Sequence, residues 1–358
     1  MQIGLVGLPR SGKTTFFNLL TGANAPTGFA ATGEIHHGSA AVPDSRIDFL
    51  TGLYRPRKTV YARIDFEDIP GTYPQGGAAR AARLLDEARG ADALVQVIPA
   101  FSGAGEKGPG EQLSPYRDLL DFYSELILAD LDAVEKRLER LRSNPKGKNN
   151  TAARIAVLER LRETLEQERP AAALPLGDDE RQLLSGQIFL SEKPLIAALN
   201  LDEQKLTVHD YPGRSRVLKY TAERGIPVIE ICARIEAEIG ELPPADRDAF
   251  LADLGLEESG LDRLARTAYE RLGLISFFTV GPDEVRAWTI RRGATARQAA
   301  GKIHSDIERG FIRAEIFQYA ALARLGSVAR VREAGLFRLE GKNYPVQDGD
   351  IIDFRFNV

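Results

Sequence analysis

A short run of residues near the N-terminus has the residue types and spacing of a phosphate-binding loop. Gly7 is followed, after four residues, by Gly12-Lys13-Thr14, which completes the Walker A pattern. In such a loop the glycines let backbone N–H groups curl around phosphate oxygens, and the lysine reaches the β- and γ-phosphates. The pattern therefore predicts a nucleotide phosphate site. Its predicted residues are Leu8, Pro9, Arg10, Ser11, Gly12, Lys13, Thr14 and Thr15.

A second segment has the pattern of a Walker B or switch II motif. It reads Asp68-Ile69-Pro70-Gly71, with two residues between the aspartate and the glycine. Hydroxyl and carboxylate oxygens suit Mg²⁺, so we expect Thr14 to coordinate the ion and Asp68 to hold it through a water. Thr32, in the polar loop between the two motifs, is the expected second hydroxyl ligand. The Gly71 amide is expected to sense the γ-phosphate. We therefore assign the catalytic contacts to Lys13, Thr32 and Gly71.

A third segment stands where a guanine-specific protein carries the motif N-K-x-D. Here it reads Asn200-Leu201-Asp202-Glu203, so leucine replaces the lysine and glutamate replaces the aspartate. The longer acid cannot keep the two hydrogen bonds that aspartate accepts from guanine, and adenine offers no matching pair of donors. The segment thus predicts a base site with a weakened preference for guanine. The residues assigned to it are Asn200, Leu201 and Glu203, together with the backbone of Cys232 and Ala233.

These motifs all follow short apolar runs that read as strands. The runs alternate with helical patterns, which indicates a doubly wound, mostly parallel α/β sheet covered on both faces. Ligands of such sheets bind at the carboxyl ends of the strands, where the motifs lie. The predicted strands are residues 3–6, 63–66, 93–98, 195–199 and 226–231.

Residues 115–169 change to a long helical pattern. Leu131, Val134, Leu138 and Leu141 recur at three- and four-residue spacing, and the segment 143–150 interrupts the pattern before it resumes. The spacing predicts an antiparallel coiled-coil hairpin, as an insertion spanning 115–185 within a nucleotide-binding domain of residues 1–275. A structural hairpin and a partner-binding arm are both compatible with this pattern.

Residues 276–358 are predicted to form a separate small domain. A strand is expected at 285–290, a helix at 294–304 and a pair of strands within 344–356 around the turn 347–350. Residues 281–358 contain 13 Lys or Arg against 10 Asp or Glu, so this part carries a positive excess.

The overall composition limits the function classes. The chain has 358 residues and a formal net charge of −4, which argues against bulk electrostatic binding of nucleic acid and against DNA sequence specificity. The single Cys232 excludes a disulfide framework and a cysteine-rich zinc site. No apolar run could span a bilayer, and the first residues lack the basic stretch of a signal peptide. We expect a cytoplasmic monomer with no membrane partner.

Further motifs are spread over nearly the whole chain. Besides the phosphate-loop and Asp68 motifs, they include Val42-Pro43-Asp44 with Arg46, and Glu125-Leu126-Ile127-Leu128-Ala129-Asp130-Leu131-Asp132. C-terminal ones are residues 236–239, 250–255, 284–290, 310–315 and 354–358. On these residues the chain resembles the YchF/Obg-like ATPases, a family of P-loop proteins related to translation factors.

The resemblance implies a GTPase-like domain, an inserted coiled coil and a β-grasp-like TGS domain. It also implies ATP in preference to GTP, dependence on Mg²⁺, and association with ribosomes or other RNA-bound machinery. The sequence departs from the family at Arg10 and Ser11, at residues 72–77, and in having no histidine between His37 and His209. Three functions stay open: a slow hydrolase that acts as a ribosome-associated switch, a nucleotide sensor with negligible hydrolysis, and an RNA- or protein-binding module.

The base-site residues lead to a first prediction, on nucleotide selectivity. ATP is expected to bind at least as tightly as GTP, by about tenfold or ~1.4 kcal/mol, because Leu201 and Glu203 replace the guanine-reading pair. Calorimetry with the two nucleotides side by side, in the presence of Mg²⁺, measures the difference. A clearly tighter GTP complex would contradict the interpretation of residues 200–203.

Overall fold

The chain divides into two compact units. The computed structural model describes residues 1–27, 34–71, 85–101, 113–143 and 150–357. The first unit comprises Met1–Gly38 and Phe66–Leu261, and the second comprises Ser39–Asp65 and Asp262–Val358. The second unit thus contains a segment from the N-terminal part of the chain.

The first sheet contains every strand predicted for the N-terminal part, and its order is β2-β4-β1-β5-β6-β7. The strands β1, β5, β6 and β7 are paired in parallel, as expected of a doubly wound α/β fold. The fully buried β5 and β6 are near-continuous apolar runs, which is typical of strands covered on both faces. The bounds are β1 Gln2–Val6, β2 His36–Ala41, β4 Arg63–Asp68, β5 Ala93–Pro99, β6 Leu195–Asn200 and β7 Val228–Ile231.

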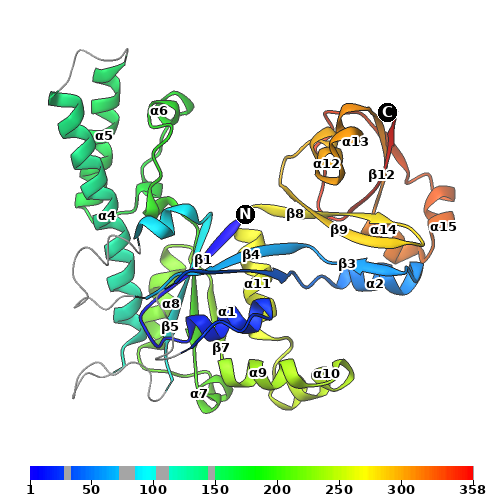
Figure 1. Cartoon of the computed structure of the whole chain (residues 1–358), viewed down its shortest axis with the longest axis horizontal. Helices are drawn as coiled ribbons and strands as arrows, with labels where there is room; N and C mark the ends of the chain where they lie inside the picture. Colours follow the sequence, from blue (N-terminus) through cyan, green and yellow to red (C-terminus); the bar gives the residue numbers. More distant parts are fainter. Residues whose placement is uncertain (28–33, 72–84, 102–112, 144–149, 358) are drawn as a thin grey trace. The chain divides into compact units, whose positions relative to one another are not determined.

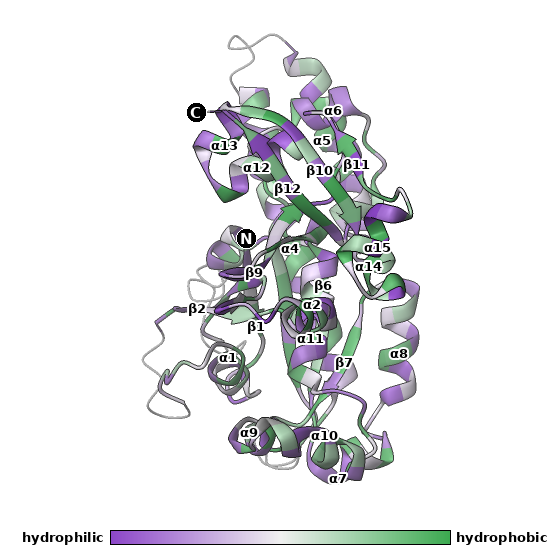
Figure 2. Cartoon of the chain, turned by 90° about the vertical axis from the view of Figure 1, so that its right-hand side faces the viewer, coloured by the Kyte–Doolittle hydropathy of each residue, from purple (hydrophilic) through white to green (hydrophobic). Residues whose placement is uncertain are grey.

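Helices connect these strands, and several carry one apolar and one hydrophilic side. Figure 2 shows both colours on α1, α8 and α9, as expected of helices with one face buried. Among the helices within the described ranges, none has the length and apolar composition needed to cross a membrane. Outside the hairpin, the described part of this unit includes the helices α1 Lys13–Thr21, α6 Asp178–Leu183, α7 Glu203–Val208, α8 Arg214–Glu223, α9 Ala233–Glu241 and α10 Pro244–Asp253.

The predicted helical hairpin is present. Its helices are α4, Pro115–Ser143, and α5, Thr151–Glu166, which lie side by side in Figure 1. Val134 and Leu138 of α4 are buried in the same hydrophobic cluster as the strand residues of the first sheet. Asp130 lies at the base of the hairpin with no exposed surface, and it accepts hydrogen bonds from the Leu190 and Ser191 amides at 2.8 Å each. The hairpin is therefore anchored to the first unit by both packing and buried polar contacts.

The second sheet has the order β11-β10-β12-β8-β9-β3. Its centre is a parallel pair, β12 with β8, flanked by antiparallel partners, which is the arrangement of a β-grasp fold. Alanines on one side of α12 pack against this sheet, which forms a core of its own. The bounds are β3 Lys58–Val60, β8 Leu274–Val280, β9 Glu284–Arg291, β10 Phe311–Gln318, β11 Arg338–Glu340 and β12 Asp350–Phe356, with α11 Gly260–Arg271, α12 Ala296–Ile303, α13 Ser305–Arg309, α14 Tyr319–Leu325 and α15 Val328–Glu333.

The prediction of a pair of strands within residues 344–356 is wrong. Only residues 350–356 form a strand, and their partners are β10 and β8. Tyr344 and Val346 instead exchange backbone hydrogen bonds with Ala296 and Ala294, at the start of α12. The turn was recognised correctly, but a turn does not determine which distant strand pairs with the residues that follow it.

Residues 39–65 belong to the second unit. They contain the end of β2, helix α2 (Ser45–Tyr54) and β3, and β3 pairs in parallel with β9. Because β3 is an edge strand of the second sheet, it extends that sheet with residues far away in the sequence. The domain boundary expected at residue 275 and the hairpin bounds of 115–185 stay predictions.

Candidate functional site

The predicted phosphate loop joins β1 to α1, and two of its glycines have no room for a side chain. Gly7 has a φ of 141°, and a Cβ placed there would lie 2.4 Å from the Val97 carbonyl oxygen. Gly12 has a φ of 99°, and its Cβ would lie 2.3 Å from Asn200 Nδ2. Arg10 adopts a φ of 62°, in the left-handed region that non-glycine residues rarely occupy. The loop is thus tightly wound, as a backbone that curls around phosphate must be.

Helix α1 begins directly after this loop, and no side chain caps its N-terminus. Gly12 is the residue before the helix, and the first turn contains no acidic residue. The N-terminal turn of a helix has backbone N–H groups without intrahelical partners and a partial positive charge. An anion is therefore favoured at this end of α1, and the phosphates of a nucleotide are suited to it.

Lys13 is the first residue of α1 and is almost fully buried. The residue is 6% exposed, and its ammonium donates a hydrogen bond to the Leu8 carbonyl oxygen at 3.3 Å. Burial lowers the pKa of Lys13 to about 8, although the nearby carboxylate of Asp68 opposes that shift. An ammonium group that is costly to charge in a buried position is stabilised when an anion binds beside it.

Thr14 and Asp68 form a pair at the carboxyl end of β4. The Thr14 hydroxyl donates a hydrogen bond to Asp68 Oδ2 at 2.6 Å. The other carboxylate oxygen, Oδ1, is buried and has no hydrogen-bond partner among the described residues. A buried carboxylate oxygen without a partner is unfavourable unless a ligand contacts it. The pair therefore fits a Mg²⁺ ion, which takes hydroxyl and carboxylate oxygens and otherwise keeps its waters.

Gly71 packs directly on the phosphate loop. A Cβ at this position would lie 2.5 Å from the Gly7 carbonyl oxygen, and 2.8 Å from both Lys13 Nζ and the Pro9 nitrogen. Only a glycine fits here, and its backbone is placed beside the lysine that would contact the terminal phosphate. The structure thus brings together Gly71, Lys13, Thr14 and Asp68.

Asn200 connects the phosphate loop to the predicted base site. Its side chain is 4% exposed, and Nδ2 donates to the Ser11 carbonyl oxygen at 3.0 Å. Its Oδ1 accepts a hydrogen bond from the Ala233 amide at 3.3 Å. The Asn200 amide therefore holds the ends of β1, β6 and β7 at one edge of the sheet. The motif identified the residue but not these two contacts, which join segments far apart in the sequence.

The base-side residues differ in exposure. Leu201 and Cys232 are 2% and 3% exposed and belong to the hydrophobic core. Their side chains have no surface toward a base, so a role for either of them rests on backbone groups. Glu203, at the start of α7, is exposed. It is the most exposed residue of the predicted base site, and Ala233 is half-buried.

Lys205 is a residue of this edge that the motifs did not single out. Its ammonium donates to the Ala100 carbonyl oxygen at 3.0 Å and to Asp202 Oδ2 at 2.7 Å, so it links the ends of β5 and β6. The only sequence signal is its position three residues after Asp202, which caps α7 by accepting from the Lys205 amide. Thr32 and Thr72 lie outside the described residues.

A parallel sheet whose first strand opens into such a loop, with a threonine–aspartate pair beside it, is the architecture of a P-loop NTPase. Two family models match the chain. A model described as a 50S ribosome-binding GTPase matches residues 2–129, and the YchF-GTPase_C model, described as a protein of unknown function, matches residues 274–357.

Relatives match the chain over its full length. A protein of Bacillus subtilis (strain 168) named ribosome-binding ATPase YchF is 41% identical, covering 100% of both chains. One of the same name from Escherichia coli O157:H7 is 38% identical, covering 100% of this chain and 99% of the relative. The structure of the Schizosaccharomyces pombe YchF GTPase superposes with a TM-score of 0.86 at 30% identity, covering 99% of this chain and 97% of that one. The chain belongs to the YchF family, and it is a nucleotide-binding P-loop NTPase.

The buried ammonium of Lys13 leads to a prediction on pH. In the free protein its pKa is lowered to about 8, and a bound phosphate raises the pKa because it favours the charged form. The resulting contribution to affinity is fully present below pH 8 and is lost as the pH rises through the higher pKa of the complex. ADP affinity should thus fall between pH 8 and pH 9, and binding at pH 8 should take up protons.

Calorimetry of ADP binding in buffers with different ionisation enthalpies measures that proton uptake directly. Uptake at pH 8 should exceed uptake at pH 7, where Lys13 is already charged in both states. An affinity that stays constant from pH 7 to pH 9, without proton uptake, would contradict the assignment of Lys13 to the phosphates.

Proposed function

We propose that this chain binds ATP with Mg²⁺, hydrolyses it slowly and acts as a ribosome-associated switch in the cytoplasm. The observation that carries the proposal is the Thr14 hydroxyl 2.6 Å from Asp68 Oδ2, with the buried Asp68 Oδ1 lacking a hydrogen-bond partner among the residues that the structure describes. A water of a Mg²⁺ ion bound to a nucleotide phosphate would satisfy that oxygen. The names of the full-length relatives, ribosome-binding ATPase, support the same function.

Each residue of the phosphate site has a distinct proposed role. Lys13 would contact the β- and γ-phosphates, the Thr14 hydroxyl would ligate Mg²⁺, and Asp68 would orient a water of the ion. Bound Mg²⁺ would supply charge neutralisation at the phosphate oxygens. The Gly71 amide, adjacent to Lys13, would sense whether the γ-phosphate is present. Thr32 is the proposed second hydroxyl ligand.

The base side supports ATP over GTP. Glu203 is exposed where a guanine-specific protein would have aspartate, and the Asn200 amide is engaged with Ser11 and Ala233. The base would therefore meet one exposed carboxylate and the backbone of residues 201 and 233. We propose a preference for adenine on this ground.

Slow hydrolysis is proposed from the residue that follows Gly71. Phosphoryl transfer depends on positioning and charge neutralisation, and a fast hydrolase adds a side chain that orients the attacking water. Thr72 stands in that position, and its short hydroxyl is a poorer water-orienting group than a glutamine. A protein that only senses ATP is the second candidate, favoured by the same residue, and single-turnover hydrolysis separates the two.

The metal role leads to a prediction on ATP binding. Asp68→Asn should weaken ATP binding about tenfold with Mg²⁺, or ~1.4 kcal/mol, and leave metal-free binding nearly unchanged. Lys13→Ala should weaken both, since the lysine contacts phosphate in either case. Titration of a fluorescent ATP analogue with and without Mg²⁺ gives the four affinities.

The matched control is Asp65→Asn, which removes an exposed carboxylate from the same strand, β4. It should bind like the wild type in both conditions. Equal affinities of wild type, Lys13→Ala and Asp68→Asn for ATP with Mg²⁺ would refute the site. Single-turnover hydrolysis by the wild type in the same buffer then tests the catalytic part of the proposal.

The ribosome partner is proposed to meet basic side chains of the second unit. Arg292, Arg297 and Lys302 are exposed near or on α12. Cations on a protein whose net charge is −4 favour one oriented contact with phosphates over indiscriminate binding to RNA. The hairpin of α4 and α5 is the alternative contact surface.

Replacing Arg292 and Arg297 with glutamate is therefore expected to reduce co-sedimentation with ribosomes, and the loss should be larger at low salt than at high salt. The control is the pair Arg216→Glu and Lys219→Glu on α8, which changes the net charge equally in the first unit. Equal sedimentation of both variants would place the contact elsewhere. If the variant with Arg292→Glu and Arg297→Glu sedimented like the wild type while the control variant did not, these two arginines would be excluded as the contact.

A further inference from the structure

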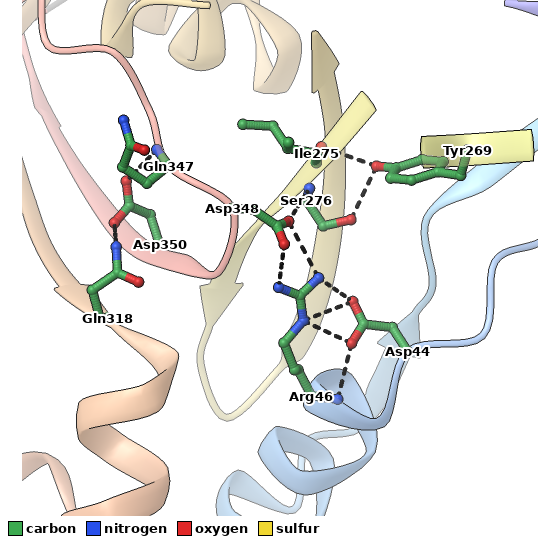
Figure 3. Close-up of polar contacts among 9 residues, drawn as sticks. All are labelled: Asp44, Arg46, Tyr269, Ile275, Ser276, Gln318, Gln347, Asp348 and Asp350. Atoms are coloured by element: carbon green, nitrogen blue, oxygen red, sulfur yellow. Dashed lines mark hydrogen bonds and ion pairs between the residues drawn. The ribbon is translucent and has the colours of Figure 1, made fainter. Parts of the chain in front are cut away.

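One arginine organises a cluster of polar contacts within the second unit that the nucleotide site does not use. Arg46, in the first turn of α2, lies between Asp44 and Asp348, as Figure 3 shows. Its Nε donates to Asp44 Oδ1 at 2.9 Å, and one terminal nitrogen donates to Asp44 Oδ2 at 2.8 Å. The other terminal nitrogen donates to Asp348 Oδ2 at 2.8 Å. We call these three residues the Arg46 clamp.

The Asp348 side of the clamp belongs to the loop before β12. Asp348 Oδ1 also accepts a hydrogen bond from the Ser276 amide of β8 at 2.9 Å. The next residue, Gly349, has a φ of 86°, and a Cβ there would lie 3.3 Å from a guanidinium nitrogen of Arg46. The guanidinium of Arg46 lies over the Phe278 ring of β8, with 5.2 Å between Arg46 Cζ and the ring centroid. The clamp therefore joins α2 to the two central strands of the second sheet.

The Asp44 side of the clamp is more buried than the Asp348 side, where the carboxylate side chain is 41% exposed. The Arg46 side chain is 25% exposed, and that of Asp44 is 12% exposed. Burial lowers the pKa of Arg46, but the hydrogen bonds to Asp44 and Asp348 outweigh it and raise the pKa above its ordinary value. Paired charge-assisted hydrogen bonds in a planar geometry are more directional than single ones. Loss of Arg46 would leave two carboxylates close together without their shared cation.

The path of the chain gives the clamp a consequence beyond stability. The segment 39–65 leaves the first unit after Gly38 and returns to it at Phe66, two residues before Asp68. Its two ends are tied to each other, since the Val42 amide donates to the Ala62 carbonyl oxygen at 2.8 Å. The segment thus leaves and re-enters the nucleotide-binding unit at neighbouring positions. Both of its ends continue into strands β2 and β4, and its first third contains Asp44 and Arg46 of the clamp.

We propose that the Arg46 clamp couples the nucleotide site to the second unit. A ligand that contacts Asp68 restrains the end of β4, and the segment 39–65 carries that restraint to Arg46. Through Asp348 the restraint reaches the loop before β12 and the start of β8. The inference rests on the proposed binding of ATP at Asp68, and reciprocity requires that a partner bound to the second unit alter nucleotide affinity through the same clamp.

A purely structural clamp would stabilise the second unit to the same degree with or without nucleotide. Coupling predicts a change that depends on nucleotide. Hydrogen–deuterium exchange of the full chain, with and without a non-hydrolysable ATP analogue and Mg²⁺, distinguishes the two. In the wild type the analogue should slow exchange in residues 66–71 and also in residues 346–351, the latter by roughly fivefold.

Two variants test the route. Arg46→Gln removes the cation, and Asp348→Asn keeps the shape of its partner but removes the charge. Both should retain the nucleotide-dependent slowing in residues 66–71 and lose it in residues 346–351. Arg46→Lys, which keeps the charge but not the paired geometry, should restore part of it.

The matched control is Arg355→Gln, which removes an ion pair to Glu315 of the same sheet, 2.7 Å long, without touching residues 39–65. It should behave as the wild type. Analogue affinity and thermal unfolding are measured on the same samples, which identifies a misfolded variant. If Arg46→Gln misfolds, exchange in Asp348→Asn and Arg46→Lys tests the coupling instead.

Persistent slowing in residues 346–351 of both Arg46→Gln and Asp348→Asn would overturn the proposal. So would a wild type that binds the analogue but shows no change in those residues. A wild type that fails to bind the analogue would overturn the proposed function and the coupling together, and the parallel affinity measurement identifies that case.

Discussion

The nucleotide site depends on backbone segments that approach one another too closely to admit side chains. At Gly7, Gly12 and Gly71 an added Cβ would lie between 2.3 and 2.5 Å from an atom of a neighbouring segment. These contacts press the phosphate loop against β5, against Asn200 and against the segment after β4. The buried ammonium of Lys13 and the pair of Thr14 and Asp68 lie beside these close contacts.

That packing has an electrostatic consequence. A site built this tightly excludes water from Lys13, which lowers the pKa of its ammonium, and leaves Asp68 Oδ1 without a partner among the described residues. Both features are unfavourable in the free protein, and the proposed binding of a nucleotide phosphate with Mg²⁺ would relieve both. A buried ammonium and a buried carboxylate oxygen arranged in this way favour an anionic ligand with its metal ion over water.

The two compact units share more than a linker. Residues 39–65 belong by packing to the second unit, although in sequence they lie between the phosphate loop and Asp68. A chain that makes such an excursion must cross between the two units twice within a short stretch, after Gly38 and before Phe66. In the proposed switch these crossings would form the route from the nucleotide site to the second unit, and the Arg46 clamp is the contact that would stiffen it.

The sequence by itself determined the features that contiguous residues encode. The Walker A loop after β1, the Asp68 to Gly71 motif, the apolar strands and the helical hairpin each depend on local spacing, which turn chemistry and periodicity make readable. Only the tertiary structure decided that Asn200 binds both Ser11 and Ala233, and that Leu201 is buried. It alone placed β12 beside β8 and β10, and residues 39–65 in the second unit. The reason is the same in each case: these outcomes depend on contacts between segments distant in sequence, where several pairings satisfy the same local pattern and packing selects one.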